Sequence, residues 1–213
     1  SVIENGIPAG GTAGQILAKT SSTDYASGWT NPTSIAGQAG YWGSFWDTVN
    51  QTIASATTAY PIQMNASDPN GSGISVTNDG NGNPTIINFA YAGVYCIQYS
   101  AQFQNADTAI HNANVWLRKN DTGSTGDIAN SDSLFAVTAS HGGTNGYTIG
   151  TVIYTLSLNA GDYLQLMWCA DSTQISLAAV GAGASPTRPA SPSVIVTAWS
   201  QPQIGIGYYG LTS

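Results

Sequence analysis

The sequence predicts an all-β protein, and three observations support this prediction. From Tyr41 onward, apolar and polar residues alternate with a period of two, as they do along strands that bury one face. Gly, Asn and Asp interrupt the alternation at short intervals, which is typical of turns. No apolar stripe repeats with the 3.6-residue period of a helix over a helical length. Many short strands separated by turns favour a β-sandwich or a jelly roll.

The expected strands follow one another along the body of the chain. They are residues 42–49, 59–65, 73–78, 85–90, 93–105, 112–120, 133–140, 148–159, 162–170, 174–181 and 193–199. The sequences NDGNGNP at 78–84 and NAGD at 159–162 place Gly and Asn where a positive φ costs least, so both are predicted hairpin connections.

The strand at 93–105 has two different faces. One face is predicted to carry Tyr95, Ile97, Tyr99, Ala101 and Phe103, and the other Val94, Cys96, Gln98, Ser100 and Gln102. The aromatic face is expected to meet the core. The small and polar face could meet a neighbouring subunit.

The chain divides into three parts by pattern. Residues 1–40 lack alternation and are expected to form an extended N-terminal arm with a linker, residues 41–200 form the β body, and residues 201–213 form an apolar tail. Ile16, Leu17, Tyr25 and Trp29 are too few to build a core, so they are candidate anchoring residues. The tail residues Ile204, Ile206, Tyr208, Tyr209 and Leu211 are candidates for docking at the base of the body.

Composition excludes several classes of partner. Only 7% of the 213 residues are charged, and four Lys and Arg against eleven Asp and Glu give a net charge of −7. Without a basic stripe, nucleic acid is not an expected partner. No apolar run approaches the roughly 20 residues of a membrane-spanning helix, so no membrane insertion is expected. The 42% of hydrophobic residues, with six Trp and eleven Tyr, supply enough apolar area for one core.

The sequence contains no recognisable catalytic constellation. Motifs of the G-x-S-x-G, H-E-x-x-H and P-loop types are lacking, and so is any Cys-rich zinc spacing. We therefore expect a noncatalytic protein without a cofactor. The Trp residues 42, 46, 116, 168 and 199 could stack on sugar rings, but all five fall in predicted strands, where burial is the ordinary explanation.

Metal and disulfide sites are not favoured. Asp121, Asp127 and Asp132 lie in a Gly-rich loop that could wrap Ca²⁺, although the spacing is not that of an EF-hand and a solvated turn explains it better. His111 or His141 could form a three-nitrogen site only on a threefold axis. Cys96 and Cys169 fit buried thiols better than a disulfide.

The body resembles a known family. The segments GISVTNDGNGNPTIINFAYAGVYCIQYSAQF, VWLRKND, LSLNAGDYLQLMW and SPTRPASPSVIVTAW follow one another in the order found in the C1q/TNF-like jelly rolls of bacteriophage structural proteins. The resemblance covers residues 42–199. It implies a homotrimer in which one sheet of each jelly roll lines the threefold interface, with both chain ends leaving from the same end.

The N-terminal arm resembles a second bacteriophage element. GTAGQILAK at 11–19, followed by Tyr25 and Trp29, is similar to the G-T-x-G-Q-x-L-x-K module with Y-x-x-x-W that occurs near the ends of trimeric fibre proteins. No heptad, collagen or β-helix repeat forms a shaft between the arm and the body.

Together the two resemblances imply a virion-surface protein. The expected function is that of a trimeric surface knob, a head fibre, decoration or short fibre component, attached by its N-terminal arm to another capsid or tail protein. The alternative is a tail-fibre adhesin that binds a host-surface glycan.

Overall fold

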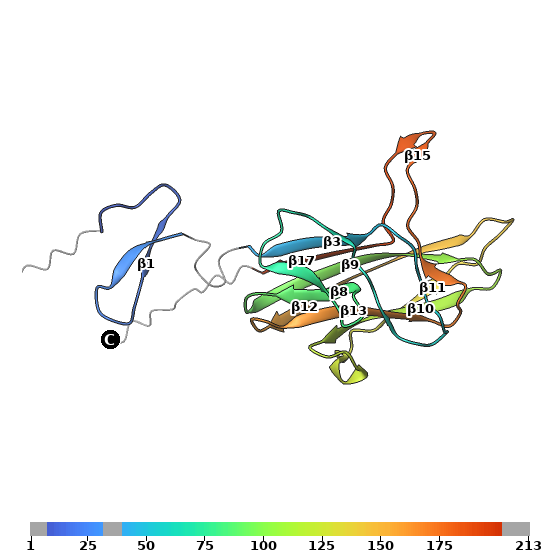
Figure 1. The fold of residues 1–213 in the computed structure, drawn as a ribbon, viewed down its shortest axis with the longest axis horizontal. Coiled ribbons are helices and arrows are strands. Elements are labelled where there is room, and N and C mark those ends of the chain that lie inside the picture. Colours follow the sequence, from blue (N-terminus) through green and yellow to red (C-terminus); the bar gives the residue numbers. More distant parts are fainter. Residues whose placement is uncertain (1–7, 32–39, 202–213) are drawn as a thin grey trace, which may run out of the picture. The chain divides into compact units, whose positions relative to one another are not determined.

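The computed structural model describes residues 8–31 and 40–201, and the chain divides into two compact units (Figure 1). One unit is Tyr41–Gln201, and the other combines Ser1–Gly40 with Pro202–Ser213. Within the described residues strands predominate, and the one helical element is a short 3₁₀ turn, Ser124–Gly126. No helix in these residues is long and apolar enough to cross a membrane. The prediction of an all-β protein is therefore confirmed.

One sheet of the larger unit is built around β9 (Gly93–Asn105). On one side β12 (Gly146–Leu158) pairs with β9 along its whole length in antiparallel register. On the other side β9 pairs with β17 (Val194–Ser200) and, nearer its own C-terminal end, with β14 (Ile175–Leu177). Three strands extend this sheet: β3 (Trp42–Asp47) beside β17, β6 (Ala66–Ser67) beside β3, and β4 (Gln51–Thr52) beside β14.

The second sheet is also antiparallel. Its order is β11 (Ser133–Val137), β10 (His111–Lys119), β13 (Tyr163–Ala170), β8 (Pro84–Phe89) and β7 (Ile74–Asn78), and β5 (Tyr60–Pro61) pairs with β13. Figure 1 shows the two sheets lying against each other, with the hairpin of β15 (Gly183–Ala184) and β16 (Thr187–Arg188) projecting from this unit. The unit is a β-sandwich.

The core lies between the two sheets. All five residues predicted for the inner face of β9 are fully buried: Tyr95, Ile97, Tyr99, Ala101 and Phe103. Rings from the opposite sheet meet them, with the Phe89 and Tyr95 ring centroids 4.8 Å apart and those of Phe103 and Trp168 6.4 Å apart. Burial of each large side chain contributes about 1.5–3 kcal/mol. The inner face of β9 is therefore the centre of the core.

The described part of the smaller unit is a β-hairpin, whereas the sequence predicts an extended arm. β1 (Ile16–Lys19) pairs with β2 (Ser27–Thr30). Trp29 donates its indole N–H to the Pro8 carbonyl at 2.5 Å, and its ring lies against Gly11, where a Cβ would come within 2.5 Å of it. Alternation does not reveal this hairpin because backbone and glycine contacts, rather than a buried face, hold it together.

Most predicted strands are confirmed, and the differences have physical causes. The predicted strand 59–65 is reduced to Tyr60–Pro61, because Pro61 has no N–H to donate to a ladder. The hairpin of β15 and β16 was missed, because its segment carries prolines and no alternation. The cysteines are free, as predicted; Cys96 is buried and Cys169 is half-buried.

The turn between β12 and β13 is fixed by a buried carboxylate, Asp162. Its oxygens accept hydrogen bonds from the Asn159 backbone N–H at 2.7 Å and the Asn120 amide at 2.6 Å, and form an ion pair with Lys119 at 2.8 Å. Burial alone would raise the pKa of Asp162, but these bonds outweigh it and lower the pKa to about 2. The turn is thereby joined to the end of β10.

We predict that Asp162→Asn destabilises the body by about 1–2 kcal/mol at pH 7, because the amide cannot accept the same charge-assisted bonds. The folded pKa is depressed, so the stabilisation is present above the unfolded value near 3.9 and is lost as pH falls towards 2. Urea unfolding at pH 7 and pH 3 measures both effects. Asp68→Asn, in a loop beside the other sheet, is the control; an equal loss for both variants, or a loss independent of pH, contradicts the prediction.

Candidate interaction surface

The side of the β9 sheet that faces away from the core is the main candidate site, and we call it the outer face. Its side chains come from four neighbouring strands in direct register: Trp42, Ser44 and Trp46 of β3, Ile195, Thr197 and Trp199 of β17, Val94, Cys96, Gln98, Ser100, Gln102 and Gln104 of β9, and Tyr147, Ile149, Thr151, Ile153, Thr155 and Ser157 of β12. None of these side chains carries a charge. About a quarter of the residues of an average soluble domain are charged, so a solvent-facing sheet surface without any charge is unusual.

Large apolar side chains are exposed on the outer face. Ile149 is 57% exposed, Ile153 55% and Ile195 41%, and Trp46 is half-buried. The isoleucines of β12 lie on one side of β9 and the residues of β17 and β3 on the other. The face therefore carries two apolar patches separated by the polar side chains of β9. Contiguous exposed apolar surface of this kind marks an interaction site.

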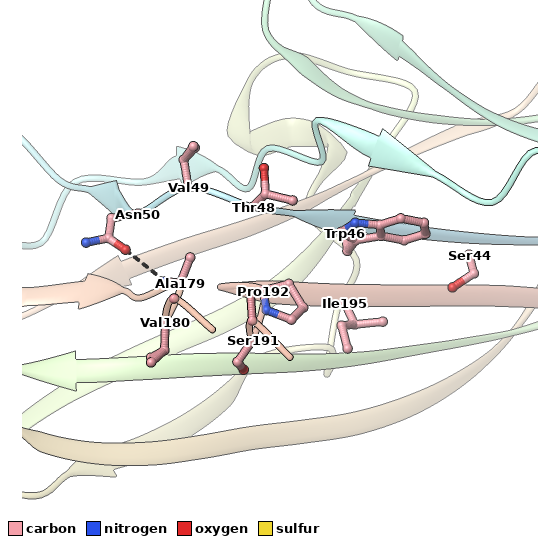
Figure 2. A pocket seen from close by; sticks show the side chains of 12 residues that line it. Ser44, Trp46, Thr48, Val49, Asn50, Ala179, Val180, Ser191, Pro192 and Ile195 are labelled. Carbon is pink, nitrogen blue, oxygen red and sulfur yellow. Dashed lines mark hydrogen bonds between the residues drawn. The ribbon is translucent and has the colours of Figure 1, made fainter. Parts of the chain in front are cut away.

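A cavity of about 820 Å³ opens at the β3 and β17 side of the outer face (Figure 2). Trp46, Val49, Val180, Pro192 and Ile195 give it an apolar lining. Its wall is held by the Ala179 N–H, which donates to the Asn50 side-chain oxygen at 2.8 Å, the bond drawn in Figure 2.

The projecting hairpin rises from the same wall. Val180 and Ser191 exchange two backbone hydrogen bonds of 2.8 Å at its stem. These bonds fix both strands where they leave the sheet. The cavity is therefore a preformed apolar hollow.

Sequence reasoning identified the small and polar face of β9 as a possible subunit contact, but it missed the apolar parts of the outer face and the hollow, although a signal for them exists. The segment 148–159 has apolar residues on both of its faces, and the prediction used only the alternation. Four of the five tryptophans assigned to ordinary strand burial are only half-buried: Trp42, Trp46, Trp116 and Trp199. Only Trp168 lies in the core, at 1% exposure. The others lie on the outward faces of the sheets.

The predicted anchoring residues lie in the hairpin of the smaller unit. Ile16, Leu17 and Tyr25 are exposed, and Trp29 is half-buried against Pro8 and Gly11. Apart from Trp29, these side chains are available to a partner. The predicted docking residues of the tail, 204, 206, 208, 209 and 211, lie outside the described residues.

The structure gives the three candidate calcium ligands separate partners. Asp121 accepts bonds from Thr125 and from the Gly123 N–H, Asp127 pairs with Arg118 at 2.7 Å, and Asp132 accepts from Asn114 at 2.8 Å. In the described residues no group of three or more His, Cys, Asp or Glu is placed to hold a metal ion.

The two histidines are in different settings. Both ring nitrogens of His111 lie within 3.0 Å of carboxylates, those of Asp107 and Asp171, and the hydrogen bond to Asp107 is the largest cause of the raised pKa of His111. The imidazole is thus already engaged within its own chain. His141 lies in a turn closed by backbone bonds to Thr144.

Comparison with known proteins adds no family to these observations. No family model matches the chain, and no curated protein matches it. The function is therefore argued from the surfaces of the molecule.

We predict that Gly11→Ala releases Trp29 from its place in the hairpin, because the new Cβ would lie 2.5 Å from the ring. Overpacking of this kind costs about 1–3 kcal/mol. The Trp29 indole N–H signal in a ¹H–¹⁵N spectrum reports the loss of its bond to Pro8. Gly80→Ala, where no atom lies within 4 Å of a built Cβ, is the control. An unchanged Trp29 signal in Gly11→Ala would show that the position of the Trp29 ring does not require a glycine at residue 11.

Proposed function

We propose that this chain is a noncatalytic structural protein of a bacteriophage virion, exposed at the virion surface. In this proposal the body is a C1q/TNF-like jelly roll that forms a homotrimeric knob. The N-terminal hairpin attaches the knob to another capsid or tail protein. The resemblance of the sequence to bacteriophage modules supplies the virion setting, and the outer face supplies the physical argument for assembly.

The observation that carries the proposal is the uncharged outer face. Each of the isoleucines on this face is about half exposed, so covering it at an interface would gain on the order of 1 kcal/mol. The side chains between the isoleucines are Ser, Thr and Gln, which can be buried at lower cost than charged groups if they find hydrogen-bond partners. A second copy of this chain presents the same kind of surface. Self-association therefore accounts for a face that is otherwise costly in solution.

The arrangement of the two apolar patches supports a closed ring. The β12 patch with Ile149 and Ile153 lies on one side of β9, and the hollow lined by Trp46 and Ile195 lies on the other. A contact between two different patches is heterologous, and heterologous contacts close into rings when the rotation allows. We therefore propose that the β12 patch of each copy packs over the β3 and β17 side of the next. Three such contacts make the trimer.

We predict that the protein has a mass in solution three times that of its 21.9 kDa chain, and that Ile153→Lys converts it to monomers. A charge buried at the contact would cost several kcal/mol without a partner. Light scattering coupled to size exclusion at micromolar concentration measures the mass.

Leu134→Lys is the matched control, because Leu134 is 65% exposed on the other sheet. It should remain trimeric. A monomeric wild type overturns the assembly proposal. Equal dissociation by both variants would show that the outer face is not the interface.

We further predict that removal of residues 1–37 leaves a folded trimer that no longer joins virus particles. The body has its own core, and the exposed residues Ile16, Leu17 and Tyr25 are lost with the arm. Circular dichroism and the occupancy of assembled particles are the two readouts. Normal occupancy of the truncated protein would place the attachment elsewhere in the chain.

A further inference from the structure

A second hollow lies on the opposite side of the sandwich, on the outward surface of the six-stranded sheet. Its volume is about 350 Å³. Asn114 and Cys169 face each other across β10 and β13, and Trp116 follows two residues later on the same face of β10. The loop after β10 completes the lining with Asp127, Asn130 and Asp132. We call this hollow the Trp116 pocket.

The loop is held firmly against β10, so the Trp116 pocket is preformed. Arg118 bonds through Nε to Asp127 at 2.7 Å and through a terminal nitrogen to the Thr122 carbonyl at 3.0 Å. Further along, the Ile128 N–H donates to the Leu117 carbonyl at 2.9 Å, and the Leu117 N–H donates to the Ser131 hydroxyl at 3.0 Å. These bonds fix both ends of the segment that carries the loop side chains.

The polar groups of the pocket include both donors and acceptors. Asp132 accepts one bond from Asn114 and has further lone pairs available, and Asn130 offers an amide. The indole nitrogen of Trp116 is buried beside the Asp127 carboxylate and is not exposed to solvent. Burial raises the pKa of Asp127, but the bond from Arg118 and the neighbouring Trp116 N–H lower it below its usual value.

The apolar part of the lining is the half-buried Trp116 ring with Ile128. A sugar ring combines an apolar C–H surface with a rim of hydroxyls, and each hydroxyl both donates and accepts. An aromatic ring next to carboxylate and amide groups matches both parts of such a ligand. The volume is near the lower end of the range of about 300–1,000 Å³ for small-molecule sites, so one saccharide unit fits better than a long chain.

Charge restricts the ligand further. Asp127 and Asp132 line the pocket, and Arg118, which holds the loop, is already paired with Asp127. An acidic sugar would bring a third carboxylate to this cluster and would be repelled. A neutral saccharide meets no such penalty.

We propose that the Trp116 pocket binds a neutral saccharide unit, whose hydroxyls bond to Asp132 and Asn114 while its C–H surface packs on the indole ring. The unit can be a free sugar or part of a polysaccharide, and the chemistry of recognition is the same. This inference does not depend on trimer formation, since it uses the other sheet.

Titration of the full chain with glucose, galactose, mannose and N-acetylglucosamine tests the proposal, with glucuronic acid as the acidic counterpart. ¹H–¹⁵N spectra resolve the indole N–H groups, and the Trp116→Phe variant assigns that of Trp116. We expect the Trp116 signal to shift with at least one neutral sugar and not with glucuronic acid. Dextran and mannan then separate a free sugar from a polymer as the source.

Asp132→Asn should weaken the binding of that sugar about tenfold or more, because a charge-assisted bond is lost. Trp116→Ala should have an effect at least as large. Asp68→Asn, outside the Trp116 pocket, should leave the affinity unchanged. Failure of every neutral sugar and both polymers to shift the Trp116 signal overturns the proposal. Equal binding of glucuronic acid, or insensitivity to Asp132→Asn, overturns it as well.

Discussion

Strand β9 is the constraint on which the body depends, because it is hydrogen-bonded on both sides and faces different surroundings on its two surfaces. β12 follows it over all thirteen residues, and β17 with β14 occupies the other side. Its inner residues are fully buried, so a shift by one residue would place Tyr95, Tyr99 and Phe103 in water. The same register fixes which residues of β12 and β17 point outward. The core thus determines the geometry of the outer face.

The few charged groups of the body are unevenly distributed between its two outward surfaces. Arg118 and Lys119 lie at the end of β10, paired with Asp127 and Asp162, and Asp132 lies in the same region. The outer face of the β9 sheet has no charged side chain on β3, β17, β9 or β12. One surface is therefore suited to association by apolar burial. The other retains polar groups that a hydrated ligand can use.

The fold could be predicted in large part from the sequence because alternation reports burial directly. The limits of β9 agree with the predicted 93–105, since thirteen residues alternate without a proline or an interior glycine. The two hairpins outside the core could not be predicted from alternation. A glycine contact holds the hairpin of β1 and β2, and two backbone hydrogen bonds at the stem hold the hairpin of β15 and β16. The outer face could be predicted only in part. Alternation separated the two faces of β9, but it could not show that Ile149 and Ile153 of β12 stay exposed.

The Trp116 pocket was less predictable, because it depends on contacts between residues far apart in the chain. Asn114 and Cys169 are neighbours only through the pairing of β10 with β13, and Asp127 reaches the pocket because Arg118 and the backbone bond of Ile128 hold its loop. This pairing also places the pocket and the outer face on opposite surfaces of one sandwich. Assembly through the outer face would therefore leave each pocket uncovered by that contact. A knob built in this way would present three equivalent pockets, and a polysaccharide with repeated units could engage more than one of them, which raises avidity without any new contact.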